Sequence, residues 1–141
     1  MFVIFVDMKK IEIASVALID LQGRLLLVRK KGSEFFQLVG GKIGPGERLL
    51  DTVIRETKEE IGLDLVPEDL TFLGQHTTAA VNEQNTLVCG NVYTSFLTFD
   101  FTPTVANEIE TFAWLDYNSY KNYKWAHLAE ELVLPWWFAL K

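Results

Sequence analysis

Hydrophobic and polar residues alternate in the early part of the chain, a pattern that predicts β-strands. Residues 11–20, IEIASVALID, alternate and are rich in β-branched residues, and the turn LQG separates them from RLLLVRK at residues 24–30. Two such runs around a glycine-containing turn are typical of a β-hairpin. A short strand, FFQLV, follows at residues 35–39. The apolar opening MFVIFV fits another short strand better than a signal peptide, because it has no basic region and no small-residue cleavage site.

The hydrophobic period then changes and predicts one helix. The glycine-rich GGKIGPGE, residues 40–47, has little helix propensity, whereas residues 48–61 contain no glycine or proline. Gly62 is suited to end such a helix. One side of the helix would carry Leu49, Val53, Thr57 and Ile61. We therefore expect a loop followed by an amphipathic helix.

Three further strands and a second helix are predicted downstream. The strands are expected at residues 70–81, 86–99 and 109–115, and a helical pattern begins near Ser119 and is interrupted at Pro135. No repeat, low-complexity tract or linker divides the chain. The predicted fold class is α/β, a mixed β-sheet flanked by helices, in a single domain over residues 1–141.

Composition and charge narrow the classes of function. With 49% hydrophobic and 23% charged residues over 141 positions, the chain can form one globular core. Its net charge of −6 disfavours a polyanionic partner such as duplex DNA but leaves room for a small phosphorylated ligand bound through a metal. The single cysteine, Cys89, suits a buried thiol in a reducing cytoplasm, and no apolar run could span a membrane. We expect a cytoplasmic protein.

Three carboxylates gather on one face of the predicted helix. Residues three and four apart share a helical face, which brings Glu56, Glu59 and Glu60 together. Like charges at this spacing destabilise a helix by about 0.2–0.5 kcal/mol per pair. We therefore expect a cation to compensate the charge of this face. Mg²⁺ or Mn²⁺ would suit these oxygen ligands. The alternative is a solvated acidic face without a ligand.

The spacing of the surrounding residues resembles the Nudix box. Gly41, Glu47, Arg55-Glu56, Glu59-Glu60 and Gly62 stand at the positions of that motif, which spans Gly41 to Leu63. The chain therefore resembles a Nudix hydrolase, and the resemblance implies the family's α/β/α sandwich. Two positions depart from the usual pattern: Thr57 stands where most members have an aliphatic residue, and Val39 where many have proline.

The resemblance implies a role for each residue of the motif. Metal ligands would be Glu56, Glu59, Glu60 and the Gly40 carbonyl, with Mg²⁺ as the cofactor and Mn²⁺ as a substitute. Arg55 would hold Glu47 and so orient the loop against the helix. Gly41 would let the backbone approach phosphates. The general base would be Glu56 or a loop glutamate, of which Glu108 is our first choice ahead of Glu83 and Glu110. Arg29 would either contact a substrate phosphate or close a surface hairpin.

The implied activity is hydrolysis of a pyrophosphate bond in a nucleoside diphosphate joined to another group. Signatures of the coenzyme A, NADH and ADP-ribose subfamilies are absent, which leaves a nucleoside triphosphate, cleaved to the monophosphate and pyrophosphate, as the first expectation. ADP-ribose or another nucleoside diphosphate derivative, and a non-catalytic ligand sensor, remain alternatives. A net charge of −6 and no basic run longer than residues 29–31 disfavour RNA decapping. Trp136 and Trp137 favour packing on the sheet or a homodimer over base stacking.

Overall fold

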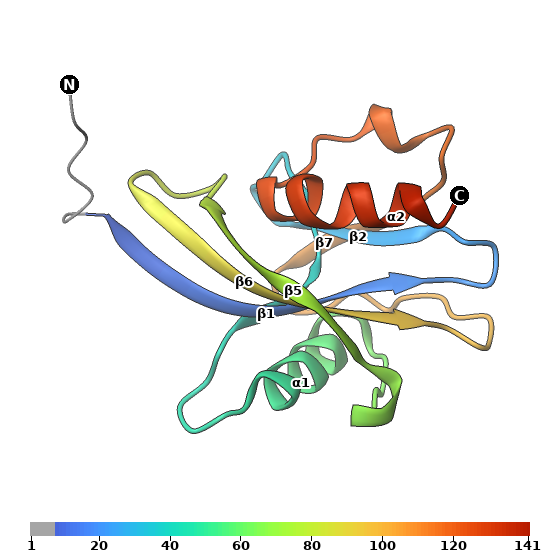
Figure 1. Cartoon of the computed structure of the whole chain (residues 1–141), viewed down its shortest axis with the longest axis horizontal. Coiled ribbons are helices and arrows are strands. Elements are labelled where there is room, and N and C mark those ends of the chain that lie inside the picture. The colour runs from blue at the N-terminus through green and yellow to red at the C-terminus, as the bar shows by residue number, and fades with distance from the viewer. Residues whose placement is uncertain (1–7) are drawn as a thin grey trace.

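The computed structural model describes residues 8–141, which form a mixed β-sheet between two helical layers (Figure 1). The strands are β1 (Lys9–Ile19), β2 (Leu25–Lys30), β3 (Phe36–Gln37), β4 (Val39–Lys42), β5 (Thr71–Ala79), β6 (Thr86–Phe96) and β7 (Ile109–Leu115). The α-helices are α1 (Leu49–Ile61) and α2 (Leu134–Ala139), and α2 continues a π-helical stretch, Ala129–Val133. The predicted α/β/α sandwich is confirmed. The strand expected over MFVIFV lies outside the described residues.

The sheet is mixed because its two longest strands run parallel. The strand order is β3-β2-β1-β6-β5, with β4 paired to β1 and β7 paired to β2. β1 and β6 are parallel in a register that runs from Lys9 opposite Thr86 to Ile19 opposite Phe96. β4 runs antiparallel to β1 and places Gly40 opposite Ser15. This pairing brings the paired glycines alongside the centre of β1.

Each face of the sheet supports a separate hydrophobic core. On one face α1 buries Val53 and Ile61 completely, and on the other the C-terminal helix buries Trp137. Successive strand residues point to opposite faces, so neighbours such as Leu26 and Leu27 belong to different cores. Helical layers on both faces therefore explain why residues 16–19 of β1 and residues 25–28 of β2 are all apolar rather than apolar at alternate positions.

Three predicted boundaries were wrong. The helix expected from Ser119 begins only at residue 127, after a 3₁₀ turn at Tyr120–Asn122. The loop expected from Gly40 begins later, because hydrogen bonding to β1 keeps Gly40 and Gly41 in strand β4. The C-terminal helix continues through Pro135, which lies in the first turn of α2, where a missing N–H is tolerated, directly after the wider π-helical turn. None of the helices within residues 8–141 is long and apolar enough to cross a membrane.

Candidate active site

Helix α1 is fixed at both ends. At its start the Asp51 carboxylate accepts the backbone N–H of Arg48, a reciprocal cap, and at its end Gly62 takes a left-handed φ of 76° and donates to the Lys58 carbonyl. Its apolar side packs on the sheet beside β4. The carboxylates of the helix are thereby held next to the glycines of β4.

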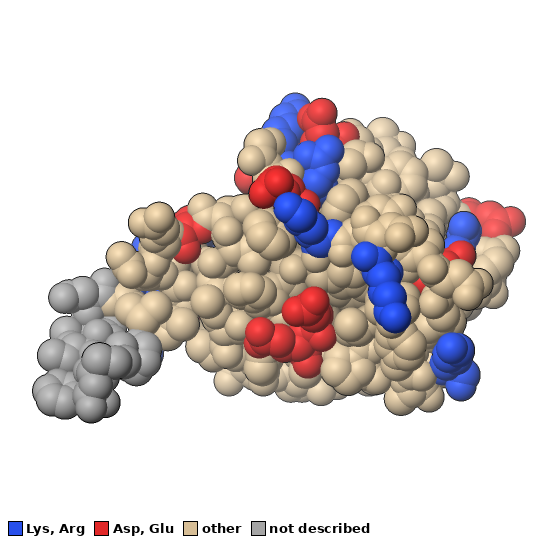
Figure 2. All heavy atoms as spheres, turned by 90° about the horizontal axis from the view of Figure 1, so that it is seen from above, with Lys and Arg blue, Asp and Glu red and all other residues tan. Residues whose placement is uncertain are grey.

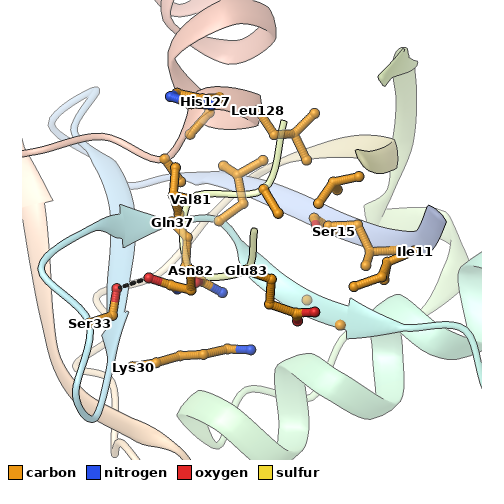
Figure 3. Close-up of a pocket in the computed structure, with 18 of the residues that line it drawn as sticks. Ile11, Ser15, Lys30, Ser33, Gln37, Val81, Asn82, Glu83, His127 and Leu128 are labelled. Atoms are coloured by element: carbon orange, nitrogen blue, oxygen red, sulfur yellow. Dashed lines mark hydrogen bonds between the residues drawn. The ribbon is translucent and has the colours of Figure 1, made fainter. Parts of the chain in front are cut away.

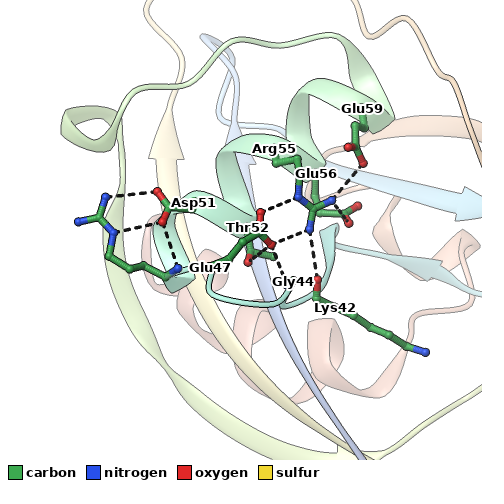
Figure 4. A network of polar contacts seen from close by, with 9 residues as sticks. Lys42, Gly44, Glu47, Asp51, Thr52, Arg55, Glu56 and Glu59 are labelled. Carbon is green, nitrogen blue, oxygen red and sulfur yellow. Dashed lines mark hydrogen bonds and ion pairs between the residues drawn. The ribbon is translucent and has the colours of Figure 1, made fainter.

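Arg55 and Glu47 form a two-pronged ion pair between the loop and the helix (Figure 4). Arg55 Nε lies 2.7 Å from Glu47 Oε2, and Arg55 Nη2 lies 2.8 Å from Oε1. The Thr52 hydroxyl and the Gly44 N–H also donate to Glu47 Oε1, at 2.9 and 2.7 Å. Chiefly through Arg55, the pKa of Glu47 falls to about 2, and the pKa of Arg55 rises. The predicted pair is present and fastens the loop.

The same guanidinium also contacts the acidic face of the helix. Arg55 Nη1 lies 2.9 Å from Glu56 Oε1 and 3.2 Å from Glu59 Oε2, and Nη2 donates to the Lys42 carbonyl at 3.4 Å. The sequence alone suggests that a metal provides all of the compensating positive charge. In the structure Arg55 supplies part of that charge from within the chain and so reduces the repulsion between these carboxylates.

Glu60 occupies a different environment from the other two carboxylates. It is 5% exposed, and its Oε1 accepts the backbone N–H of Gly40 at 3.2 Å. Burial raises the pKa of Glu60 to about 8, the Gly40 N–H opposes that rise, and the negative charge of Glu56 adds to it. A buried carboxylate of this kind gains strongly from a nearby cation.

Two glycines beside these carboxylates leave no room for a side chain unless a neighbour moves. A Cβ on Gly41 would lie 2.6 Å from Glu56 Cδ and 2.7 and 2.8 Å from its two oxygens. At Gly40 the φ is 152°, and a Cβ would collide with the Ala14 carbonyl oxygen and the Ser15 hydroxyl. The missing side chain at Gly41 thus makes the space in which the Glu56 carboxylate sits.

The predicted ligand set is only partly gathered. Within residues 8–141 no three His, Cys, Asp or Glu side chains meet as a ready-made metal site. Glu56 and Glu59 are joined through Arg55, while Glu60 faces Gly40. The available donors, carboxylate oxygens next to backbone carbonyls, nevertheless fit a hard divalent cation such as Mg²⁺. The metal assignment stays a prediction.

Lys30, which was not among the residues singled out from the sequence, lies nearer to the acidic site than Arg29. Arg29 donates to the Ser33 carbonyl at 2.9 Å and lies over the Phe36 ring, whereas Lys30 Nζ lies 3.6 Å from Glu108 Oε2. The positive charge of Lys30 and the negative charge of Glu108 both act on Glu60. Strand alternation could have shown this, because Lys30 shares its parity with Leu26 and Val28 of the α1-side core.

A cavity of about 410 Å³ lies beside β4 (Figure 3). The wall of this cavity includes Gly40, Gly41 and Lys42 of β4. The same three residues lie next to Glu60, Glu56 and Arg55 of α1, respectively. Strand β4 therefore separates the cavity from the acidic face of the helix. Lys30 and Glu83 line the cavity as well. Its volume is in the range of small-ligand sites.

The remaining candidate residues lie outside this arrangement. Glu110 is exposed on β7. His76 pairs with Glu131 at 2.7 Å, and His127 Nδ1 donates to the Ala79 carbonyl at 2.9 Å. Trp137 is fully buried and donates to the Gly23 carbonyl at 2.9 Å. These contacts hold the C-terminal helix on the sheet.

The amino-acid sequence of this chain is similar to one family model and to several curated proteins. The NUDIX domain model matches residues 9–137. The m7GpppN-mRNA hydrolase of Saccharomyces cerevisiae is 35% identical over 102 residues, which cover 67% of this chain and 9% of that protein. The dihydroneopterin triphosphate diphosphatase of Escherichia coli is 37% identical over 54 residues, 38% of this chain and 36% of that protein. The chain thus spans only part of the curated relatives it matches.

The fold also matches solved structures. The NUDIX domain of Shewanella oneidensis NrtR, solved with ADP-ribose, superposes with a TM-score of 0.75 at 16% identity, covering 94% of this chain and 89% of that one. At this identity the likeness concerns the fold and not the ligand. The sheet and the helices of this chain therefore match the fold of that NUDIX domain.

Proposed function

This chain belongs to the NUDIX domain family of pyrophosphohydrolases, and from that premise we propose that it cleaves nucleoside triphosphates to monophosphates and pyrophosphate with a divalent metal. One observation carries the proposal: β4 lines a ligand-sized cavity on one side and adjoins the α1 carboxylates on the other. A nucleoside in the cavity would therefore extend its phosphates along Gly40 and Gly41 towards the acidic face.

The residues that would hold the metal are Glu56, Glu59, Glu60 and the Gly40 carbonyl. Mg²⁺ bound there would neutralise phosphate charge and lower the pKa of a bound water. Arg55 and Glu47 keep the loop and helix in place, and Lys30 offers a positive charge at the cavity wall. The contact between Glu60 and Gly40 and the ion pair between Arg55 and Glu47 support this proposal.

Glu108 is our proposed general base. A water oxygen would form a bond to phosphorus, the bond from that phosphorus to the bridging oxygen would break, and the carboxylate would take the proton of the water. Glu108 precedes β7, lies 3.6 Å from Lys30 and is close enough to Glu60 to influence its pKa. Glu83, which lines the cavity directly, is the alternative.

Glu108→Gln tests this role. We expect kcat to fall by roughly 10²–10⁴-fold, the usual cost of losing a general base, with little change in metal affinity. Glu110→Gln, on an exposed position of the same strand region, is the matched control and should leave kcat unchanged. Near-normal kcat in Glu108→Gln would return the role to Glu56 or Glu83.

The similarity to the yeast mRNA hydrolase favours a second candidate, hydrolysis of an RNA cap. On the face seen in Figure 2, lysine and arginine side chains lie in small separate groups with acidic side chains between them, not in one basic stripe. A net charge of −6 adds to the electrostatic cost of an RNA chain. The triphosphate in the name of the Escherichia coli relative supports the smaller substrate.

A substrate screen tests the proposal. The protein is incubated with nucleoside triphosphates, ADP-ribose and capped RNA, each with Mg²⁺ or Mn²⁺, and products are separated by ion-exchange chromatography. We expect monophosphate and pyrophosphate from triphosphates. Release of phosphate and diphosphate, or turnover only of ADP-ribose or capped RNA, would overturn the substrate assignment. Tight binding without turnover of any compound would favour a ligand sensor.

A further inference from the structure

Main-chain hydrogen bonds attach the loop that carries Glu108 to helix α1 and to the end of strand β2. The Ala106 N–H donates to the backbone carbonyl of Glu60 at 3.1 Å, and the Lys31 N–H donates to the backbone carbonyl of Glu108 at 2.8 Å. Ile109, the residue after Glu108, is 3% exposed and belongs to the core on the α1 side of the sheet. The backbone on either side of Glu108 is therefore held in place.

A β-bulge lies in β7 next to this loop, where the register of β7 against β2 shifts opposite Arg29 and Lys30. An extra residue in one strand bends that strand and redirects the side chains beside it, and bulges are common next to active sites. The bulge allows Ile109 to face the same core as Phe112, although strand residues at an odd spacing otherwise point to opposite faces. It therefore rotates the start of β7, and the adjoining Glu108, relative to the rest of the strand.

Asn107 has a backbone conformation that few residues other than glycine adopt. Its φ is 57°, in the left-handed region, and it is the first central residue of a turn in which the Ile109 N–H donates to the Ala106 carbonyl at 3.1 Å. Turns with a positive φ at this position favour glycine and asparagine. Glu108 is the second central residue, so the conformation of Asn107 sets its direction.

Side-chain contacts do not account for this geometry. The side chain of Glu108 is 71% exposed, and its ion pair with Lys30 at 3.6 Å holds it only weakly, as is usual for exposed pairs. The side chain of Asn107 is exposed and forms no hydrogen bond within residues 8–141. The backbone conformation of Asn107 is therefore what orients Glu108.

We infer that Asn107 is a positioning residue, whose left-handed backbone conformation directs the Glu108 carboxylate towards Lys30 and so into the proposed site. This inference rests on the proposed function, because Glu108 is the general base proposed there. A β-branched residue is strongly disfavoured at positive φ, whereas glycine adopts it freely. Asn107→Val should therefore turn Glu108 out of the site, and Asn107→Gly should keep it there.

The test measures kcat and KM for the hydrolysis of GTP, a representative nucleoside triphosphate, with Mg²⁺. We expect Asn107→Val to lower kcat roughly 10–100-fold with little change in KM, because a misplaced general base slows the chemical step. Asn107→Gly should keep the wild-type kcat. In the Glu108→Gln background Asn107→Val should cost little more, since the group that Asn107 positions has already been removed.

Asn85→Val is the matched control. Asn85 is the other non-glycine residue with positive φ within residues 8–141, and it lies with a φ of 52° in the loop between β5 and β6, outside the cavity beside β4. The substitution imposes the same kind of backbone strain as Asn107→Val but should leave kcat unchanged. It thereby separates a loss of positioning from a loss of stability.

Wild-type kcat in Asn107→Val, equal losses in Asn107→Val and Asn107→Gly, or an equal loss from Asn107→Val in the wild type and in Glu108→Gln would each overturn the inference. If Asn107→Val does not fold, Asn107→Ala, which is less strained at positive φ, is judged by the same three outcomes. If the wild type hydrolyses no nucleotide, the proposed function fails, and amide hydrogen exchange at Lys31, followed by NMR, decides the inference. Faster exchange in Asn107→Val but not in Asn107→Gly would support it, and unchanged exchange would overturn it.

Discussion

Arg55 connects the three parts of the site through a single side chain. It joins the loop through Glu47, the helix through Glu56 and Glu59, and strand β4 through a backbone carbonyl. Its planar fork makes these contacts in fixed directions, which a lysine ammonium cannot reproduce. Orientation, rather than contact with substrate, is therefore the task we assign to it.

A double-mutant cycle tests this task. Arg55→Lys and Glu47→Gln should each lower kcat/KM substantially, and the double variant should cost much less than the sum because the two residues act as a unit. Arg48→Lys is the control, since Arg48 pairs only with Asp51 among the described residues and its side chain is 82% exposed. Simple additivity of the two substitutions would show that they act independently.

The side chain of Thr57 lowers the stability of the fold. Its side chain is fully buried, and its hydroxyl oxygen has no hydrogen-bond partner among the described residues. A buried polar group without a partner destabilises a fold by about 1–3 kcal/mol. This is the position where the motif usually carries an aliphatic side chain, so the departure noted in the sequence has a structural consequence.

Thr57→Val should accordingly raise the free energy of unfolding by about 1 kcal/mol, measured by urea denaturation. The matched control is Thr52→Val on the same helix. Thr52 is equally buried, but its hydroxyl donates to Glu47 at 2.9 Å, so the same change removes a hydrogen bond and should destabilise. Equal effects of both substitutions would contradict this explanation.

At the scale of elements, the packing of α1 against β4 sets the properties of Glu60. The carboxyl is shut between the helix and the Gly40 backbone, and its pKa rises from the ordinary 4.5 to about 8. A raised pKa in the fold means that stability is fully present below pH 4.5 and is lost as pH rises towards 8. Because a tenfold difference in proton affinity between the folded and unfolded states is worth about 1.4 kcal/mol, this loss is large enough to measure.

We therefore expect the metal-free protein to lose stability as the pH rises from 4.5 to about 8. Glu60→Gln should remove this loss: the variant should match the wild type near pH 5 and exceed it near pH 9. Chemical denaturation in the presence of a chelator measures both. Glu130→Gln, on an exposed position of the C-terminal helix, should follow the wild type. A pH profile that Glu60→Gln leaves unchanged would show that Glu60 is not the group responsible.

The helices and strands differ in how accurately the sequence predicts their boundaries. Helix α1 was predicted almost residue by residue, because its capping residues and its apolar period agree. Gly40 and Gly41 were assigned to a loop, since glycine has low strand propensity and the pairing with β1 is a tertiary effect. Pro135 suggested a break that the preceding π-helical turn avoids.

At the scale of the whole molecule, the sequence could predict the motif but not the cavity. Arg55 and Glu47 are 8 residues apart, and their pairing follows from the motif spacing. By contrast, Ser33 and Asn82 meet only because the loop after β2 and the loop between β5 and β6 come together at the cavity. No local sequence pattern predicts a contact between two residues that are 49 positions apart. The fold and the motif could therefore be predicted from the sequence, whereas the residues that line the cavity could not.

The proposed chemistry depends on the carboxylates of α1 acting through a divalent metal. The most direct measurement is GTP turnover as a function of Mg²⁺ concentration in the wild type, Glu59→Gln and Glu60→Gln, with Glu130→Gln as the control and circular dichroism to verify the fold. We predict that each of the first two substitutions lowers kcat by roughly 10²-fold or more and raises the Mg²⁺ concentration needed, while the control behaves as the wild type. Wild-type turnover and Mg²⁺ dependence in both folded variants would contradict a metal site on α1.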